Sequence, residues 1–389
     1  MGDEKGSGLE DAERLENYEG AEAAAVAAGK ASMSREFSSR AVGRSGLFAE
    51  LRENDNVYPE HYMVLTNDGG GTKLTLCPWL DNFRTVGQDI VAMNANDMAT
   101  LGRAMVDAVN LYFAVQNQVE EEKMGDIMAG IDNAIDLCLA PDMPFGPNYG
   151  KLETATLTEM LSSTHEGYGF DVGCSFTGFI KKEGLPDFDP KPGWIIIGLG
   201  ASGAHSNGYT GLRHLFFKPD IEPRERYKSQ YRGKHDIDDP LPGTNMSIGE
   251  AMLTPTEIYF RTMWRIAQKV PEAFGVNITG YGLKNFNRFG EEVVYNIRNP
   301  MEPHPLLELA VKEGGYSEEV AYEKFNMGLG FAVMVPDQMS SLKALRIANE
   351  EGHRASVIGS VDESIEVEPM VQLYLPGRSD DPIQFRGYN

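Results

Sequence analysis

The glycine-rich turn NDGGGTK, residues 67–73, combines residue types that bind phosphate and magnesium. Consecutive glycines such as Gly70 and Gly71 leave backbone N–H groups open to anionic oxygens. Asp68 supplies a hard carboxylate oxygen of the kind that Mg²⁺ prefers, and Lys73 supplies a point charge for phosphate. A plain hairpin turn is the alternative, since Asp-Gly is a strong turn signal. Three glycines exceed what a tight turn needs, which favours a binding role.

A second group of polar residues lies in the otherwise apolar stretch GQDIVAMNANDM, residues 87–98. On a helix, Asp89 and Asn96 would lie on nearly the same face, with Asp97 about 80° away. Buried carboxylates are costly unless they are paired or bind a metal. Asp89 could instead cap the start of the helix, but capping would not explain Asn96 and Asp97 so far inside it. Together with Asp68, the two acids predict a Mg²⁺–phosphate site.

A weaker signal comes from KLETATLTEM, residues 151–160, where Glu153 is followed by small residues and threonines. This composition predicts a tight polar loop. A single glutamate in a loop is usually just solvated, so the stretch alone does not establish a site.

The stretch GLGASGAHSNGY, residues 198–209, places a histidine, a serine and an asparagine after a run of glycines, at a predicted helix N-terminus. Ser206 or Asn207 could be an N-cap, and His205 could be a structural hydrogen-bonding residue. Together with Gly203, the same residues could instead hold an anionic or polar substrate.

The glycines of this stretch also fit the GxGxxG spacing of a dinucleotide-binding turn, at Gly198, Gly200 and Gly203. That reading requires a βαβ unit with an acid at the end of its next strand. Asp220 is near the expected distance but lies in a polar stretch that is not strand-like. The prediction of a nicotinamide-dependent oxidoreductase therefore rests on this spacing alone.

Strand-like and helix-like segments alternate loosely along the chain, which predicts mixed α/β or α+β layers. The expected strands cover residues 61–66, 73–77, 108–115, 167–182, 194–200, 329–335, 354–361 and 364–375, and the expected helices cover 86–105, 121–140, 247–270 with a break near Pro255, and 336–352. The predicted divisions are an N-terminal arm, helical or mobile, at 1–40, a first domain at 41–183, a linker at 184–193 and a second domain at 194–389.

Composition narrows the classes of partner. The net charge of −23 over 389 residues argues against a nucleic-acid surface, which would need a basic stripe. The longest apolar runs are far too short to span a bilayer, and the N-terminus lacks an apolar signal core. Cys77, Cys138 and Cys174 are far apart and odd in number, which predicts free thiols in a reducing, cytoplasmic setting.

Several of these blocks occur in the order seen in the phosphoribosylformylglycinamidine cyclo-ligases, also called AIR synthetases. The chain resembles this family over roughly residues 60–360. The HSNGY block with FNxGxG is quite specific to this branch, whereas the DGxGTK and ND blocks are shared with kinase, selenophosphate-synthetase and amidine-synthetase relatives. The matching blocks are NDGGGTK, GQDIVAMNAND, LETA, FDVGCSFTGFI, GLGASGAHSNGYTGLR, LTPTEIY, ITGYG and FNMGLG.

The resemblance implies a two-domain AIR synthetase-like fold, in which the N-terminal sheets of two copies form a dimer-spanning barrel beside a C-terminal α/β domain. It also implies a reaction of de novo purine biosynthesis. ATP phosphorylates the amide oxygen of formylglycinamidine ribonucleotide, a nitrogen of the substrate attacks the activated carbon, and phosphate leaves as the imidazole closes. The implied cofactors are ATP and Mg²⁺, and the implied partners are a nucleotide substrate and a second copy of the chain.

The resemblance also implies roles for individual residues. Those implied to hold the metal are Asp68, Asp89, Asp97 and Glu153. Those implied to bind ATP are Asp68, Gly70, Gly71, Thr72, Lys73, Asp89 and Asn96. Gly203, His205, Ser206 and Asn207 would face the substrate, and Lys73, Asp97 and His205 would be catalytic.

Some positions depart from the family pattern. FRTVG at 83–87 stands where the family commonly has HDTIG, and LETATLTEM replaces GGETAEMPG. Asn277 and Tyr281 replace a histidine and a glycine around TGGG, and 218–243 looks like a charged surface insertion or lid. These changes keep two alternatives open. One is an ATP-using phosphotransferase or amidine-forming relative with another acceptor, and the other is a non-catalytic nucleotide-binding paralogue.

Overall fold

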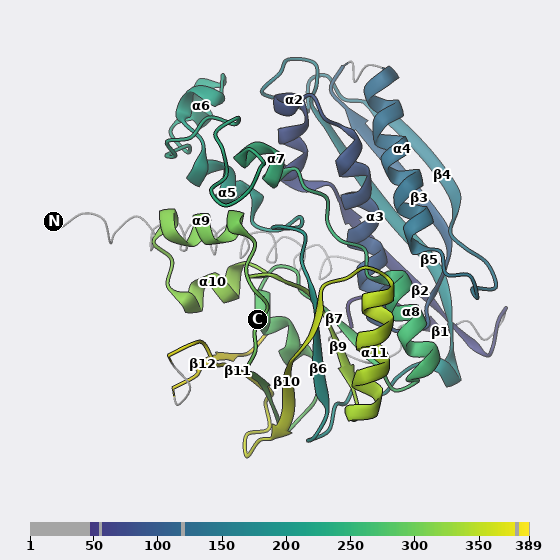
Figure 1. The fold of residues 1–389 in the computed structure, drawn as a ribbon. Coiled ribbons are helices and arrows are strands. Elements are labelled where there is room, and N and C mark those ends of the chain that lie inside the picture. The colour runs from purple at the N-terminus through teal and green to yellow at the C-terminus, as the bar shows by residue number, and fades with distance from the viewer. Residues whose placement is uncertain (1–46, 54–56, 118–120, 378–380, 389) are drawn as a thin grey trace, which may run out of the picture.

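The computed structural model describes residues 47–53, 57–117, 121–377 and 381–388 (Figure 1). The arm predicted at residues 1–40 lies outside these ranges. Among the helices that the structure describes, none combines the length and the apolarity needed to cross a membrane.

The first half of the described chain forms a five-stranded sheet in the order β1-β2-β5-β3-β4. Neighbouring strands are antiparallel except for β3 and β4, which are parallel. Burial alternates residue by residue along β5, so one face of the sheet is buried and the other is open. The strands are β1 (Glu50–Glu53), β2 (His61–Gly69), β3 (Met105–Val115), β4 (Asn148–Thr156) and β5 (Phe170–Lys181).

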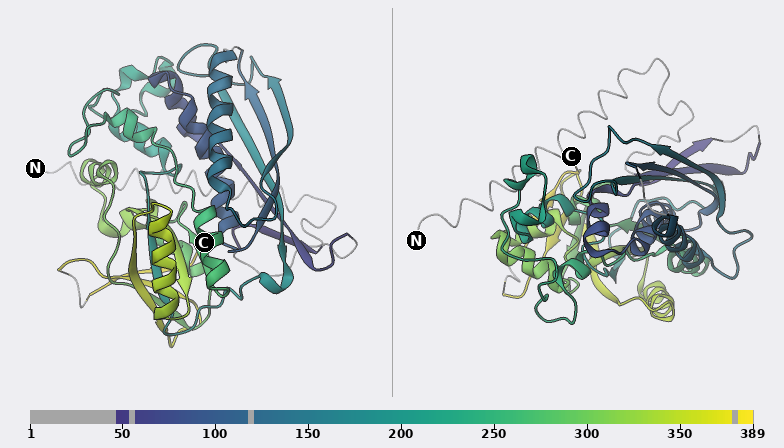
Figure 2. Two further views of the ribbon diagram at one scale, coloured as in Figure 1. Left: turned by 45° about the vertical axis from the view of Figure 1, so that its right-hand side comes forward. Right: turned by 90° about the horizontal axis from the view of Figure 1, so that it is seen from above.

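Two helices, α3 (Arg84–Ala99) and α4 (Glu121–Cys138), lie side by side on the buried face (Figure 2). They approach closely because both carry glycine where they cross. A Cβ atom on Gly130 would lie 2.0 Å from the carbonyl oxygen of Arg84, and one on Gly87 would lie 2.4 Å from that of Ile127. The crossing fixes α3 against the sheet, and α3 carries Asp89, Asn96 and Asp97.

The second half forms a seven-stranded mixed sheet in the order β12-β11-β8-β10-β6-β9-β7. Every residue of β9 is buried, as its unbroken apolar sequence predicts. The strands are β6 (Ile195–Gly200), β7 (Phe274–Asn277), β8 (Val293–Ile297), β9 (Leu329–Val335), β10 (Ala355–Glu363), β11 (Met370–Leu373) and β12 (Ile383–Arg386).

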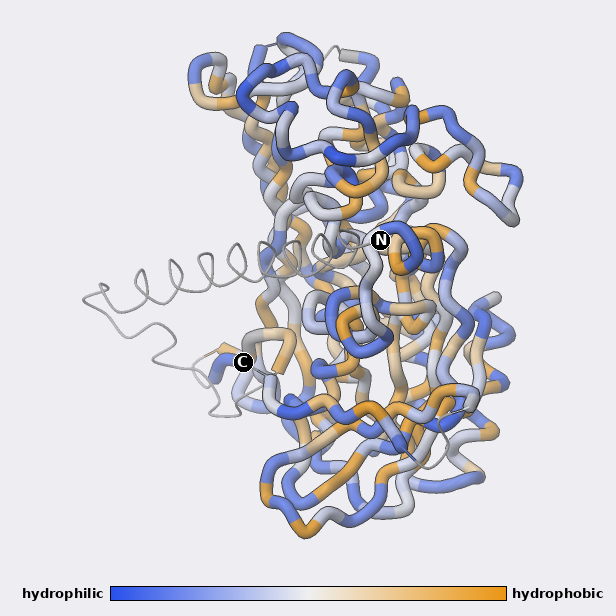
Figure 3. The backbone as a smooth tube through the Cα atoms, turned by 90° about the vertical axis from the view of Figure 1, so that its left-hand side faces the viewer, coloured by the Kyte–Doolittle hydropathy of each residue, from blue (hydrophilic) through white to orange (hydrophobic). Residues whose placement is uncertain are grey.

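In the second half, α8 and α11 lie side by side against this sheet, whereas α5, α6 and α7 lie above it, toward the helices of the first half (Figure 1). Hydrophilic loops alternate with hydrophobic segments along the backbone, in keeping with one face of each element packing inward (Figure 3). The helices are α5 (Tyr209–Phe216), α6 (Glu225–Lys228), α7 (Ile248–Met252), α8 (Phe260–Lys269), α9 (Pro305–Gly314), α10 (Glu318–Lys324) and α11 (Gln338–Glu350), and the 3₁₀ turns are η2 (Lys182–Gly184), η3 (Pro219–Ile221) and η4 (Gly282–Arg288).

Most predicted elements are confirmed, including β3, α4, β9 and the interrupted helix at 247–270, which is α7 and α8. The helix predicted at 86–105 ends earlier than expected, at Ala99, and Met105 already belongs to β3. Two predictions of element type are wrong. Residues 73–77 are not a strand, because the chain turns at the glycines into η1 (Gly71–Thr75) and α2 (Leu76–Leu80). Residues 151–156 are not a loop, because they pair with β3 as part of β4.

Candidate active site

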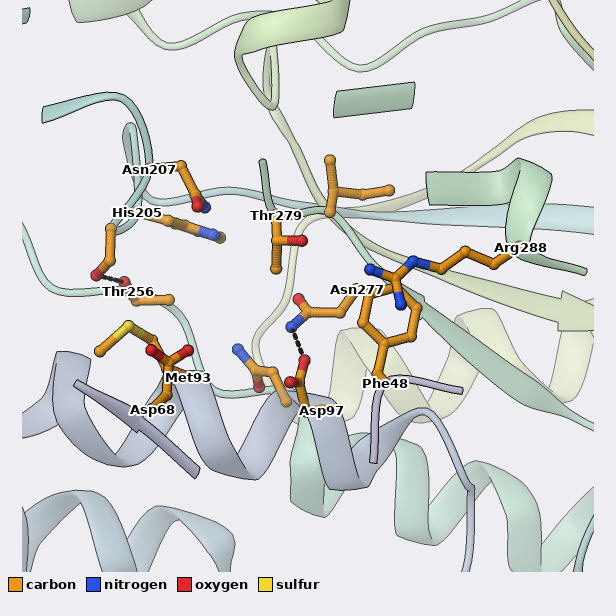
Figure 4. A pocket seen from close by; sticks show the side chains of 13 residues that line it. Phe48, Asp68, Met93, Asp97, His205, Asn207, Thr256, Asn277, Thr279 and Arg288 are labelled. Atoms are coloured by element: carbon orange, nitrogen blue, oxygen red, sulfur yellow. Dashed lines mark hydrogen bonds between the residues drawn. The ribbon is translucent and has the colours of Figure 1, made fainter. Parts of the chain in front are cut away.

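A cavity of about 200 Å³ lies where the two halves of the chain meet (Figure 4). The end of β2 and the helix α3 contribute one wall, and the segments at 205–207, 256 and 277–288 contribute the others. Its lining residues are Phe48, Asp68, Met93, Asn96, Asp97, His205, Ser206, Asn207, Thr256, Asn277, Ile278, Thr279 and Arg288. The cavity therefore brings together the predicted metal-binding and substrate-binding segments.

Two of the predicted carboxylates, Asp68 and Asp97, line this cavity. Asp68 is exposed near the end of β2, and Asp97 is half-buried in the last turn of α3. Burial raises the pKa of Asp97 to about 7, opposed by a hydrogen bond from Asn277 Nδ2 at 2.8 Å and by Arg288, and supported by the nearby charge of Asp68. The carboxylates of Asp68 and Asp97 therefore place hard oxygen donors at a polar cavity.

Asp89 is held differently, although it lies on the same helix. Its Oδ1 atom accepts hydrogen bonds from the Thr256 backbone N–H at 2.7 Å, from Thr256 Oγ1 at 2.6 Å and from Ser206 Oγ at 3.2 Å. Asp89 lies in the second turn of α3, so it does not cap the helix. Its contacts join α3 to two loops of the second half.

Lys73 completes this cluster. Its ammonium group is buried and donates to Asp89 Oδ1 at 2.9 Å, to the His205 carbonyl at 3.0 Å and to the Thr254 carbonyl at 2.6 Å. Burial lowers the pKa of Lys73, and the charge of Asp89 opposes that shift. Lys73, which was predicted to bind phosphate, therefore donates to three protein oxygens, and it joins the glycine turn to the His205 loop.

Asn96 also joins the halves. Its Nδ2 atom donates to the Glu257 carbonyl at 2.8 Å, and its Oδ1 atom accepts from the Tyr259 backbone N–H at 2.8 Å. Both groups of the buried amide are thus used to position the LTPTEIY segment, which supplies Thr256 to the cavity.

Two of the three glycines in the turn beside Asp68, Gly70 and Gly71, have different surroundings. Gly71 is exposed with a φ of +62°, and a Cβ atom there would have no neighbour within 4 Å, so its backbone is open to a ligand. A Cβ atom on Gly70 would lie 2.4 Å from the Leu74 side chain. Thr72 Oγ1 lies 3.0 Å from Thr210 Oγ1 of the second half.

The His205 loop directly precedes α5, whose N-cap is Gly208 with no side-chain cap, so Ser206 and Asn207 do not cap that helix. His205 is buried with a φ of +57°, an uncommon conformation for a non-glycine residue. Its Nε2 atom accepts from the Ser202 N–H at 3.3 Å, and burial together with Lys73 lowers its pKa to about 3.

The neighbours of His205 divide between the cavity and the second half. Asn207 lines the cavity, and Ser206 lines it while also bonding Asp89 and lying 3.0 Å from Thr256 Oγ1. Gly203 lies behind them, and its carbonyl accepts from Asn326 Nδ2 at 2.8 Å. The asparagine of the FNMGLG block thus supports the turn that carries the histidine.

Glu153 is not brought to this cavity. It lies exposed on β4, where its carboxylate pairs with Lys151 Nζ at 2.8 Å. In the part of the chain that the structure describes, no group of three or more His, Cys, Asp or Glu side chains could hold a metal ion. The four predicted metal ligands are therefore spread over three places, with Asp68 and Asp97 together, Asp89 beside Lys73, and Glu153 on β4.

Other cavity residues were not singled out as site residues in the sequence. Thr256 and Thr279 lie inside the LTPTEIY and ITGYG blocks, which marked their neighbourhood but not their role. Phe48 and Arg288 had no motif signal, because Phe48 reaches the cavity only where the segment before β1 packs on Arg288 and Phe289 of the second half.

The fold is that of the proteins related to AIR synthetase. Residues 52–141 match the family model for the N-terminal domain of AIR synthase related proteins. The crystal structure of a HypE–HypF complex is similar in fold, with a TM-score of 0.56 at 14% identity over 93% of this chain and 97% of that one. The hydrogenase maturation protein HypE in complex with ATP has a TM-score of 0.52 at 15% identity, over 81% and 83% of the two chains.

Sequence similarity narrows the class. The phosphoribosylformylglycinamidine cyclo-ligase of Methanocaldococcus jannaschii is 34% identical over 313 residues, which are 80% of this chain and 81% of the relative. The chain belongs to the phosphoribosylformylglycinamidine cyclo-ligase family, which confirms the predicted family, enzyme class and AIR synthetase-like fold.

Proposed function

We propose that this protein closes the imidazole ring of aminoimidazole ribonucleotide from formylglycinamidine ribonucleotide, with ATP converted to ADP and phosphate. One observation carries the proposal. A single cavity is lined by the carboxylates of β2 and α3 on one side and by the His205 loop on the other. Phosphoryl transfer depends mainly on positioning and charge neutralisation, and this cavity supplies groups for both.

The donor set fits a magnesium ion at Asp68 and Asp97. Both are carboxylates at one polar cavity, with the amide of Asn277 beside them. A bound Mg²⁺ would neutralise phosphate charge there. Asp89 contributes by holding Lys73 and Thr256 in place, and Glu153 would join a metal site only if a second copy brought it near.

The exposed backbone at Gly71, next to Thr72, is the proposed contact for ATP phosphates. Its N–H lies in a turn with open space where a side chain would be, which suits the approach of an anionic oxygen. The solved HypE complex with ATP supports nucleotide binding in this fold. Lys73 then acts as a positioning residue, because its ammonium spans the glycine turn and the His205 loop.

His205 would contact the substrate as a neutral ring. Its lowered pKa keeps the imidazole uncharged at neutral pH, so it would serve as a hydrogen-bonding group that orients the substrate. Ser206 and Asn207 would add polar contacts on the same wall.

We further propose a homodimer formed through the open face of the five-stranded sheet. Figure 2 shows α3 and α4 on one side of this sheet only. Tyr112 of β3 is 45% exposed on this open face, where a second copy would cover it. Tyr112→Arg should shift the protein toward monomer in sedimentation experiments, and an unchanged dimer would exclude this face.

The reaction is tested by incubating the protein with Mg²⁺ and ATP, with and without formylglycinamidine ribonucleotide, while measuring ADP and the aminoimidazole product. Joint appearance of both products in a one-to-one ratio supports the proposal. ADP release that does not depend on this substrate points to a relative with another acceptor, and no turnover with retained ATP binding points to a binding paralogue.

A further inference from the structure

Arg288 brings a positive charge to a cavity whose other charged lining residues are aspartates. Figure 4 shows its side chain reaching the cavity beside Asn277 and Phe48. Arg288 is the last residue of η4, next to Asn287, whose Nδ2 atom donates to the carbonyls of Phe385 and Gly387 at 3.1 Å each. The turn that carries the arginine is therefore tied to the C-terminal strand.

The guanidinium group is held by two aromatic rings. Its central carbon lies 3.9 Å from the centre of the Phe48 ring and 4.0 Å from the centre of the Tyr388 ring. Stacked rings occupy the faces of a guanidinium and leave its in-plane N–H groups for hydrogen bonding. A side chain held in this way loses little rotamer freedom when it binds a ligand.

Among the described residues that line the cavity, Arg288 supplies the positive charge. Burial lowers the pKa of Arg288 to about 10, opposed by Asp97, so the group remains a cation at neutral pH. Asp68 and Asp97 are the anionic residues of the lining, and Asp97 is near enough to Arg288 to oppose the lowering of its pKa. The glycine turn at Gly71 and Thr72 does not line the cavity, so Arg288 is a second, separate place for a phosphate group.

We propose that Arg288 recognises the 5′-phosphate of the ribonucleotide substrate and so determines that a nucleotide, rather than a nucleoside, is used. The inference rests on the proposed function. The planar fork of an arginine matches two oxygens of a phosphate, and such charge-assisted pairs are stronger than neutral ones. The substrate phosphate takes no part in ring closure, so its binding supplies orientation.

Binding of ribose 5-phosphate and of ribose to the full-length protein, measured by calorimetry, tests the inference without turnover. The unaltered protein should bind ribose 5-phosphate and not ribose. Arg288→Met should weaken ribose 5-phosphate binding about 10- to 100-fold, and Arg288→Lys should fall between. Arg298→Met is the matched control, because Arg298 stacks on Tyr374 at the same 4.0 Å but does not line the cavity, and it should change nothing.

Steady-state kinetics then distinguishes binding of the phosphate of the ribonucleotide substrate from binding of the phosphates of ATP. Arg288→Met should raise KM for formylglycinamidine ribonucleotide by a similar factor and leave KM for ATP unchanged. An equal rise for ATP, or undiminished ribose 5-phosphate binding by the variant, would overturn the inference. If the unaltered protein makes no aminoimidazole product but binds ribose 5-phosphate through Arg288, the proposed reaction fails while the phosphate assignment stands.

A second variant guards against a folding defect. Phe48→Ala keeps the guanidinium but removes one of its stacked rings, so it should weaken ribose 5-phosphate binding less than Arg288→Met does. Thermal unfolding midpoints of all variants show which are folded. If both variants are folded and both bind ribose 5-phosphate as strongly as the unaltered protein, the proposed arrangement is contradicted.

Discussion

The two aspartates of α3 lie eight residues apart on one helix, yet they stand in different chemical settings. Asp89 is 2% exposed, and one of its oxygens accepts bonds from Lys73, Thr256 and Ser206. Asp97 faces the cavity, where Asn277 donates to it. The first carboxylate is used to hold the two halves of the chain together, and the second is available to a ligand.

The difference shows that a carboxylate in a buried helix has two ways to recover the cost of burial. One is a set of internal donors, as at Asp89, and the other is a ligand from outside, as proposed at Asp97. Lys73 belongs with the first type, because its ammonium donates to protein oxygens on three sides. Variants at the two ends of α3 should therefore fail in different assays.

The largest expected effect is at the Asp89 end. Asp89→Ala removes the partner of a buried ammonium, and such changes destabilise proteins by about 3–5 kcal/mol. Urea unfolding should show this loss. The double variant Lys73→Met/Asp89→Ala should recover part of it, since neither charge is then buried alone. Equal stability of Asp89→Ala and the unaltered protein would contradict the role assigned to this pair.

At the other end, Asp97→Asn should lower kcat/KM by on the order of 10²–10³, because a charge that would hold the metal is lost at the reacting groups. Its unfolding free energy should stay near that of the unaltered protein, since the amide keeps the shape. Asp68→Asn should act in the same direction. Full activity of Asp97→Asn would remove this residue from the metal site.

His205 allows a test by pH, because its loop contacts both the Lys73–Asp89 pair and the cavity that Asp97 lines. The unfolded chain takes up a proton on this ring below about pH 6.5, whereas the folded ring stays neutral until about pH 3. Unfolding therefore binds a proton in that window, and stability should fall as pH decreases from 6.5 toward 3. His205→Asn, which tolerates a positive φ, should show a shallower fall; an identical pH dependence would contradict the burial of a neutral ring.

The smallest effect is expected for Glu153→Gln. Glu153 is exposed beside Lys151 on β4 and lies outside the cavity, so activity and the Mg²⁺ concentration for half-maximal rate should change less than about twofold. Titration of activity with Mg²⁺ measures both. A large rise in the Mg²⁺ requirement would instead place Glu153 in a site completed by a second copy of the chain.

Much of the fold could be read from local sequence patterns. The strand β9 was predicted because its unbroken apolar run is buried throughout, and the helix α4 because its apolar residues recur at helical spacing on one buried face. The strand predicted at 73–77 failed because its apolar residues pack as a short helix once Gly71 has turned the chain. The loop predicted at 151–160 failed over residues 151–156, because polar residues on an exposed edge strand resemble a loop.

The sequence by itself determined the family, the alternating α/β layers, and the two segments that meet at the cavity, since ordered motif blocks and local periodicity carry that information. It could not assign the roles of individual polar residues within those segments. Asp89, Lys73 and Asn96 find partners in Thr256, Thr254 and Tyr259, which lie more than 160 residues away in the chain. Arg288 and Phe48 meet only because the segment before β1 packs on the second half. Which charges are enclosed by protein and which face a ligand depends on such distant contacts, because burial and hydrogen-bond partners are properties of the assembled fold.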